Sequence, residues 1–122
     1  MSFTVTSKMK MAGIHVIEPV GRLNSNTYPM LEELVDEILK EVPEAIVFDM
    51  AMLDYISSMG VRVIAKAQKA LKEINGKIVL MRLQPQIKKV FDIVRALPSE
   101  QVFGSMEELD AYLDHMQKQM AE

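Results

Sequence analysis

Cysteine is absent from this 122-residue chain, and histidine occurs only twice. Without cysteine there is no disulfide bond, no thiolate metal site and no cysteine nucleophile, so any catalysis would have to rest on histidine, serine or carboxylates. His15 and His115 stand far apart in the sequence, and isolated histidines more often pack in a core or face solvent than act as ligands. We therefore expect no metal, no cofactor and no enzymatic activity.

Long apolar runs and concentrated positive charge are missing as well. No stretch of about 18 apolar residues is present to span a membrane, and the N-terminal residues lack the apolar core of a signal peptide. The 14 basic and 17 acidic residues give a net charge of −3, with no cluster of lysines and arginines that would displace phosphate counterions. We expect a cytoplasmic protein, monomeric or weakly dimeric, with no membrane partner and no direct binding to nucleic acid.

What is present is the composition of an ordinary globular protein. Hydrophobic residues make up 49% of the chain and charged residues 25%, with five glycines and five prolines, so no part of it stands out as a linker. A chain of this length buries roughly two-thirds of the surface that its unfolded form exposes. Residues 1–122 are therefore expected to form one domain around one core.

The first part of the chain predicts a β-hairpin followed by a helix. Phe3–Thr6 and Ile14–Ile17 are rich in β-formers, with turn-prone residues between them. Ser25–Thr27 offers possible N-caps before Pro29, which fits the first turn of a helix because its missing N–H costs nothing there. The helix is expected over residues 28–42, with an inner face made of Leu31, Leu34, Val35, Ile38 and Val42.

The rest of the chain alternates strands and helices. Ala45–Phe48 is a continuous apolar run, as in a central strand that is covered on both faces, and a loop is expected from Met50 to Ser58. A helical stripe then runs from Val61 to Ile74 and ends at Asn75-Gly76, a good helix terminator. The remaining predicted elements are a strand at Lys77–Met81, a helix from Gln84-Pro85, a short edge strand at Val102-Phe103 and a helix over 106–119 that opens with the capping box Ser105–Glu108.

This order of elements favours an α/β fold. Alternating strands and helices after a hairpin imply a mixed sheet, with antiparallel opening strands and right-handed parallel crossovers. We expect four to five strands and about four helices in this single domain.

The segment from Asp49 to Gly60 is the place where we expect function. It follows the carboxyl end of a central strand and precedes a helix, where functional groups of open α/β sheets gather. Ser57 and Ser58 stand at the helix start, so one of them is expected to be its N-cap. Gly60 would allow a partner or another backbone to approach closely.

Residues Asp54-Tyr55-Ile56-Ser57-Ser58-Met59-Gly60-Val61-Arg62-Val63 resemble the signature of STAS domains, the fold of bacterial anti-sigma factor antagonists. In that signature an aromatic-apolar pair precedes a phosphorylatable serine and a glycine at a helix start. The resemblance extends over nearly the whole chain. Its other landmarks are Gly21-Arg22-Leu23-Asn24, Asn75-Gly76-Lys77 and the stretch from Pro85 to Phe91.

The resemblance implies that Ser58 is the phosphorylated residue and that Gly60 is the glycine that follows it. Ser57 stands where the family commonly has aspartate, which leaves Ser57 as the second candidate, and Met59 replaces a small residue. The residues that the resemblance assigns to partner binding are Asn24, Ser25, Asp54, Tyr55, Ile56, Ser57, Met59, Gly60 and Arg62.

As a function, the resemblance implies a partner-switching protein. When unphosphorylated, such a protein binds an anti-sigma factor serine/threonine kinase and thereby frees a sigma factor; phosphorylation by that kinase releases it, and a metal-dependent serine phosphatase resets it. An alternative within the same family is a scaffold or accessory subunit of a signalling complex or a lipid transporter. A small hydrolase using Ser58 with His15 or His115 would be a different class, but the chain has no nucleophile-elbow motif.

A phosphate at this position is physically suited to a switch. It adds about −1.5 to −2 charges and is tolerated at a helix N-terminus, whereas a partner that buries the neutral hydroxyl would have to desolvate a dianion. If Ser58 is a cap, Ser58→Asp should fold at least as stably as Ser58→Ala. Asp49 and Asp54 suggest phosphoaspartate chemistry instead, but the paired acids that such a site needs to hold Mg²⁺ are not evident. Met50, Met52 and Met59 are expected to border the interaction face.

Overall fold

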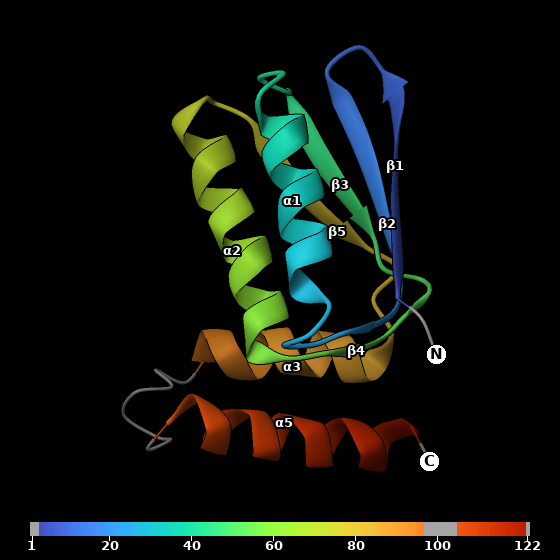
Figure 1. The fold of residues 1–122 in the computed structure, drawn as a ribbon, viewed down its shortest axis with the longest axis vertical. Coiled ribbons are helices and arrows are strands. Elements are labelled where there is room, and N and C mark those ends of the chain that lie inside the picture. The colour runs from blue at the N-terminus through green and yellow to red at the C-terminus, as the bar shows by residue number, and fades with distance from the viewer. Residues whose placement is uncertain (1–2, 97–104, 122) are drawn as a thin grey trace.

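The computed structural model describes residues 3–96 and 105–121, in which four helices accompany a mixed five-stranded sheet (Figure 1). The predicted α/β class, strand number and helix number are confirmed. No helix in these ranges is long and apolar enough to cross a membrane. The elements are, in chain order, β1 (Thr4–Met11), β2 (Ile14–Leu23), α1 (Tyr28–Leu39), β3 (Ala45–Asp49), β4 (Leu53–Ile56), α2 (Ser58–Glu73), β5 (Lys77–Met81), α3 (Pro85–Ala96) and α5 (Met106–Ala121).

The sheet is built around the long strand β2. The strand order is β1-β2-β3-β5, and β4 pairs with the far end of β2. The opening hairpin is antiparallel, with Thr4 opposite Val20, while β2, β3 and β5 run parallel to one another. Both the predicted hairpin and the predicted parallel pairing are therefore confirmed.

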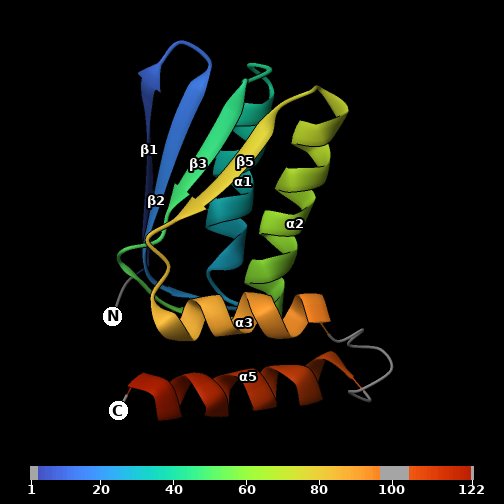
Figure 2. The same ribbon diagram turned by 180° about the vertical axis from the view of Figure 1, so that it is seen from behind.

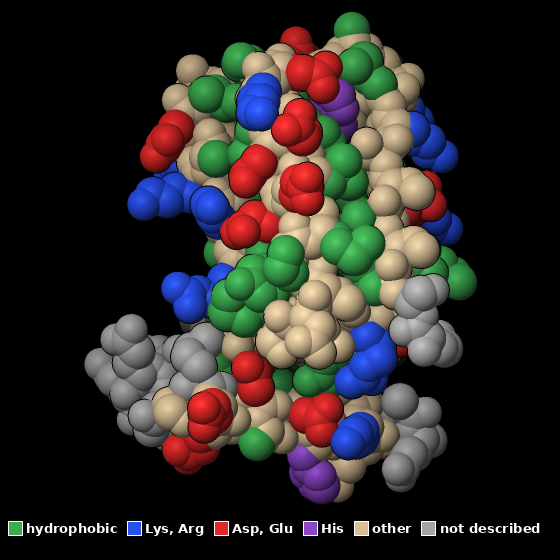
Figure 3. Space-filling model, viewed as in Figure 1, with side chains coloured by type: hydrophobic (Ala, Val, Ile, Leu, Met, Phe, Trp, Pro, Cys, Tyr) green, Lys and Arg blue, Asp and Glu red, His purple; other side chains and the backbone are tan. Residues whose placement is uncertain are grey.

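The helices form two groups. α1 and α2 cover one face of the sheet, whereas α3 and α5 lie across one end of it (Figures 1 and 2). α1 buries Leu31, Val35 and Ile38 and turns acidic side chains outward, which Figure 3 shows as a row of acidic groups along the helix. This arrangement leaves the second face of the sheet without a helix (Figure 2).

The prediction that β3 is covered on both faces was wrong. Ile46 and Phe48 are fully buried under the helices, but Val47 on the other face is only half-buried, and Val79 beside it on β5 is 43% exposed. A short apolar run cannot distinguish a strand with two covered faces from one whose second face carries apolar residues in contact with solvent. α3 and α5 pack at the end of the sheet instead of behind it.

The predicted helix boundaries hold except at the end of α1 and at the end of α5, which runs to Ala121 instead of residue 119. α1 ends at Leu39, and Val42, predicted on its inner face, is 64% exposed with φ of +49°. Pro43 follows and disfavours helical backbone in the residue before it. The terminator after α2 is confirmed, because Asn75 adopts φ of +59° and ends the helix.

Strand β4 lies inside the segment that was predicted to be a loop. It has four residues and pairs in parallel with the end of β2, placing Ile56 beside Leu23. A strand this short is stabilised by its neighbour and leaves little pattern of its own. The predicted edge strand at Val102-Phe103 lies outside the described residues.

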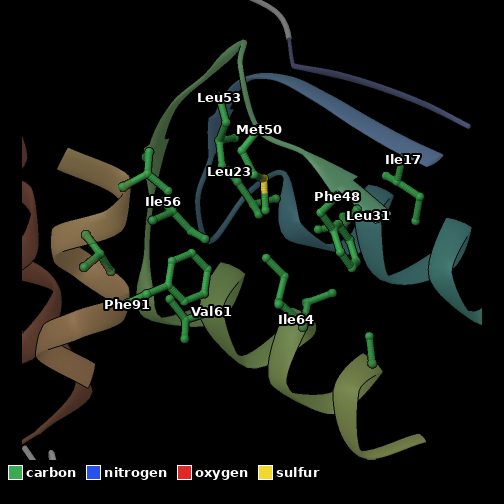
Figure 4. Close-up of a cluster of buried hydrophobic side chains, with 14 of the residues drawn as sticks. Ile17, Leu23, Leu31, Phe48, Met50, Leu53, Ile56, Val61, Ile64 and Phe91 are labelled. Carbon is green, nitrogen blue, oxygen red and sulfur yellow. The ribbon is translucent and has the colours of Figure 1, made fainter. Parts of the chain in front are cut away.

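The core runs without a break from the sheet to the start of α2. Figure 4 shows Phe48 and Leu31 in the layer between the sheet and α1, and Ile56, Val61 and Phe91 where β4, α2 and α3 meet. All five side chains are at most 8% exposed and belong to the same core cluster. The start of α2 is therefore held in place from three sides.

Candidate functional site

The two serines at the start of α2 have different structural roles. Ser57 has extended backbone and is the N-cap: its Oγ accepts a hydrogen bond from the Gly60 N–H at 3.4 Å. Its own N–H donates to the Leu23 carbonyl at 2.9 Å, which ties the cap to the end of β2. Ser58 is the first helical residue, so its hydroxyl is not needed to cap the helix.

Ser58 instead bonds to a carboxylate that comes from α5. Its Oγ–H donates to Asp110 Oδ2 at 2.8 Å and its backbone N–H donates to Asp110 Oδ1 at 2.8 Å. Ser58 is only 3% exposed as a result of this packing. A negative charge here is favoured by the positive end of the helix dipole and by the N–H groups of the first turn, which have no carbonyl partner within the helix. The start of α2 therefore already holds an anionic group.

A second contact from α5 lies about two helical turns further along. The Gln117 side chain accepts from the Ile56 N–H at 3.0 Å and donates from Nε2 to the Ile56 carbonyl at 2.8 Å. Its amide thus pairs with β4 as another strand would. Gln117 is 2% exposed, so these bonds are sheltered from water.

Tyr55 lies under a cation and beside two acids of α5. The Arg22 guanidinium stands over its ring, with Cζ 4.0 Å from the centroid. Burial raises the pKa of Tyr55 to about 12; Asp114 and Asp110 add to the rise, and Arg22 opposes it. The phenol is therefore neutral at physiological pH, and the charge at this site belongs to the carboxylates of α5 and to Arg22.

The residues predicted to bind a partner do not share one exposed surface. Ser25, Asp54 and Arg62 are exposed, and Asn24 and Met59 are half-buried. The remaining four are buried: Tyr55, Ile56, Ser57 and Gly60. Of the methionines expected at the interaction face, Met52 is 61% exposed, whereas Met50 is fully buried.

Asp110 and Gln117, the two side chains that join α5 to the site, were not predicted from the sequence. Both lie on the same helix face as Leu109 and Leu113, which are buried in the core. A polar residue within the apolar stripe of an amphipathic helix is the signal that would have marked them, because a buried polar group needs a partner.

The two aspartates considered for phosphoaspartate chemistry are held in other ways. Asp49 is buried and forms an ion pair with Arg82, whose Nε donates to Oδ1 at 2.9 Å. The hydrogen bond from Arg82 lowers the pKa of Asp49, despite the opposing effect of burial. Asp54 is exposed and receives a hydrogen bond from Gln84 at 3.4 Å. Neither position forms part of a cluster of acids: no three His, Asp or Glu side chains in the described ranges are placed to hold a metal ion.

The ion pair of Asp49 predicts how stability depends on pH. A carboxyl whose pKa is lowered on folding stabilises the protein at pH values above its unfolded pKa of 3.8. This stabilisation is lost as the pH falls through the folded pKa. We expect Arg82→Gln to lower the melting temperature at pH 7 and to have a much smaller effect near pH 2. Thermal melts at both pH values test this, with Lys89→Gln as an exposed control of equal charge change. An equal loss at both pH values would contradict it.

Gly60 is required by packing inside the chain. A Cβ at this position would lie 2.7 Å from Cγ1 of Ile56 and 2.9 Å from Cγ of Leu23, both of which are fully buried. The close approach expected at Gly60 therefore comes from β2 and β4. The absence of a side chain at Gly60 lets the start of α2 pack closely against Leu23 and Ile56.

Gly60→Ala should therefore destabilise the fold, even though alanine favours helices. We expect a loss of about 1–3 kcal/mol of unfolding free energy, because the extra methyl group overpacks a filled core. Urea denaturation measures the loss, and Lys69→Ala, on the exposed side of α2, is the control and should change stability by less than about 0.5 kcal/mol. Equal stability of the two variants would show that Leu23 and Ile56 move aside without cost.

His15 and His115 lie in different environments. His15 is 5% exposed within β2, and His115 is exposed on α5. Neither donates to or accepts from Ser58, whose hydroxyl bonds to Asp110. The described residues thus give no support to the hydrolase alternative, which needs a histidine at the serine.

Comparisons with known proteins support this fold. Residues 8–109 match the STAS domain family. BtrV of Bordetella bronchiseptica, named as an anti-sigma factor antagonist, is 33% identical over 84 residues, which cover 69% of this chain and 72% of BtrV.

Two solved structures share the fold at lower identity. The anti-sigma factor antagonist SpoIIAA of Bacillus, in its unphosphorylated form, has a TM-score of 0.70 at 18% identity and covers 81% of this chain and 93% of its own. An anti-sigma factor antagonist from Mycobacterium paratuberculosis has a TM-score of 0.62 at 20% identity and covers 80% of this chain and 84% of its own. The chain therefore belongs to the STAS domain family, and its relatives there are anti-sigma factor antagonists.

Proposed function

We propose that this protein is an anti-sigma factor antagonist that changes partners according to phosphorylation of Ser58. When unphosphorylated, it binds an anti-sigma factor serine kinase, and the sigma factor held by that kinase is freed. The kinase then phosphorylates Ser58, and the phosphorylated protein is released. A metal-dependent serine phosphatase hydrolyses the phosphate ester and restores the binding form. In this cycle the protein is a regulator and not an enzyme.

The observation that carries the proposal is the chemistry of the first residue of α2. Ser58 has a hydroxyl and a backbone N–H that point at the same carboxylate, so the position accommodates negative charge at the helix start. A phosphate on Oγ would find the same N–H and the same dipole. The domain can therefore carry the modification without unfolding.

The modification itself is an ordinary phosphoryl transfer. Ser58 Oγ forms a bond to the γ-phosphorus of ATP, and the bond from that phosphorus to the oxygen of the leaving ADP breaks. The hydroxyl proton passes to a base of the kinase. This protein supplies only the nucleophilic hydroxyl, and the kinase supplies ATP, metal ions and base.

Ser58 is a better acceptor than Ser57 for a structural reason. Ser57 Oγ caps α2 by accepting from Gly60, so a phosphate there would disturb the hydrogen bond that starts the helix. Ser58 has no capping role to lose. Support also comes from the relatives: SpoIIAA, which shares the fold, has been solved in phosphorylated and unphosphorylated forms.

Mass spectrometry tests the proposal directly. After incubation with the cognate kinase and ATP, intact mass and fragment spectra should show one phosphate, on Ser58. Ser58→Ala should remain unmodified, and Ser57→Ala should still accept phosphate. A phosphate found only on Ser57, or none in the presence of an active kinase, overturns the assignment.

A further inference from the structure

The Ser58 hydroxyl, which must accept the phosphate in the proposed function, is buried in this conformation. Ser58 is 3% exposed, and its Oγ–H already donates to Asp110 at 2.8 Å. To phosphorylate Ser58, a kinase must bring the γ-phosphorus of ATP to about 3–3.5 Å from Ser58 Oγ. The described structure leaves no such approach while Asp110 stays in place. Phosphorylation therefore requires α5 to move.

α5 is held over the site by polar as well as apolar contacts. Leu109 and Leu113 pack into the core from this helix, and Met116 is partly buried against it. Beside them, Asp110 bonds to Ser58 and Gln117 bonds to Ile56. A helix held partly by hydrogen bonds to one serine can be released by a change at that serine, because the bonds need both partners in the right chemical state.

Phosphorylation is such a change. The phosphate would carry close to two negative charges and would occupy the space in which the Asp110 carboxylate now lies. Both groups would compete for the Ser58 N–H, which Asp110 Oδ1 now accepts at 2.8 Å. Asp114 is a second acid on the same helix, and Arg22, 3.9 Å from Asp114, is already engaged there. Like charges this close together repel each other at a part-buried site.

We propose that α5 is an autoinhibitory lid whose Asp110 closes Ser58, and that a phosphate on Ser58 expels this lid. The proposal rests on Ser58 being the phosphorylated residue. While α5 is docked, Ser58 is not accessible to the kinase, so phosphorylation occurs only when the lid opens. Expulsion then changes the surface around the start of α2 as well as its charge, since α5 no longer covers β4. The lid thereby couples a local modification to the loss of a whole helix from the site.

Hydrogen exchange measured by NMR on the full chain tests the lid without any kinase. The Ile56 amide is the reporter, because its bond goes to Gln117 on α5. Ser58→Asp places a carboxylate against Asp110, and we expect its Ile56 amide to exchange at least about tenfold faster than that of Ser58→Ala. Adding Asp110→Asn to Ser58→Asp removes one of the two charges and should restore exchange to within about threefold of Ser58→Ala.

The Phe48 amide, in the middle of the sheet, reports global unfolding in the same spectra. The proposal requires Ile56 to accelerate more than Phe48 and Asp110→Asn to reverse the effect. An unchanged Ile56 amide in Ser58→Asp overturns the lid. If the double variant does not restore slow exchange of the Ile56 amide, the lid is overturned too. The effect of Ser58→Asp would then not come from repulsion by Asp110, and this conclusion holds even if Ser58→Asp unfolds globally.

A kinase assay separates the lid from the proposed function. With the cognate kinase, Asp110→Asn should be phosphorylated at least about fivefold faster than wild type, because the closed state is weakened. Glu107→Gln removes the same charge from an exposed position of α5 and should stay within about twofold of wild type. Equal rates for wild type and Asp110→Asn, with phosphate on Ser58, overturn the lid and leave the switch. No phosphate on Ser58 in any variant overturns the switch, while the exchange data still decide whether α5 opens.

Discussion

Ser58→Asp should bind the anti-sigma kinase at least about tenfold more weakly than Ser58→Ala, which corresponds to about 1.4 kcal/mol of binding free energy or more. Alanine keeps the surface neutral and leaves the Ser58 N–H bonded to Asp110, so α5 should stay in place. Aspartate brings a charge that must be buried without a partner in the complex, and this penalty falls on binding. It also disturbs the helix that covers the site.

The structure reverses the stability ranking that the sequence suggested for these two variants. The expectation that Ser58→Asp would be the more stable assumed that Ser58 caps α2, but the cap is Ser57. An aspartate at position 58 would instead face the Asp110 carboxylate, which lies 2.8 Å from the present hydroxyl. We therefore expect Ser58→Ala to melt at the higher temperature.

Titration calorimetry and thermal melts on the same samples test both statements. Calorimetry should rank wild type and Ser58→Ala together, above Ser58→Asp, and the melts should also place Ser58→Ala above Ser58→Asp. Equal kinase affinity of the two variants would mean that charge at position 58 is not the switch, and the scaffold or transporter-accessory alternative would gain. A higher melting temperature for Ser58→Asp would show that the helix dipole outweighs the repulsion from Asp110.

The second large effect is expected at Gln117. Gln117→Met keeps the size of the side chain but leaves the Ile56 N–H and carbonyl without their partners. Unsatisfied buried groups cost about 1–3 kcal/mol each, so α5 should dock at least about 2 kcal/mol more weakly. The Ile56 amide should then exchange roughly thirtyfold faster, since each 1.4 kcal/mol is a factor of ten.

Gln119→Met is the matched control for this variant. It makes the same chemical change on the same helix at an exposed position and should leave Ile56 exchange within about twofold of wild type. If the two variants behaved alike, the bonds from Gln117 would contribute nothing measurable to the docking of α5. Hydrogen exchange by NMR distinguishes the outcomes, and the Phe48 amide again reports global stability.

Much of this protein is determined locally by its sequence. The hairpin, the start of α1 at Thr27, the end of α2 at Asn75 and the cap of α5 at Ser105 follow from residues a few positions apart, and the structure confirms all of them. Local signals work here because caps, turns and amphipathic stripes act over one or two turns of chain. The signature around Ser58 is also local, which is why the family could be identified from the sequence.

The tertiary structure decided what lies opposite those residues. β4 forms because the end of β2 offers it a partner, and Ser58 is closed because Asp110, 52 residues away, meets it across the packing of α5. The same is true of Gln117 and Ile56, which are 61 positions apart. A sequence pattern states that a side chain will be buried or polar, but the choice of partner depends on how whole elements pack. Hydrogen bonds at such separations are therefore fixed only when the fold is complete.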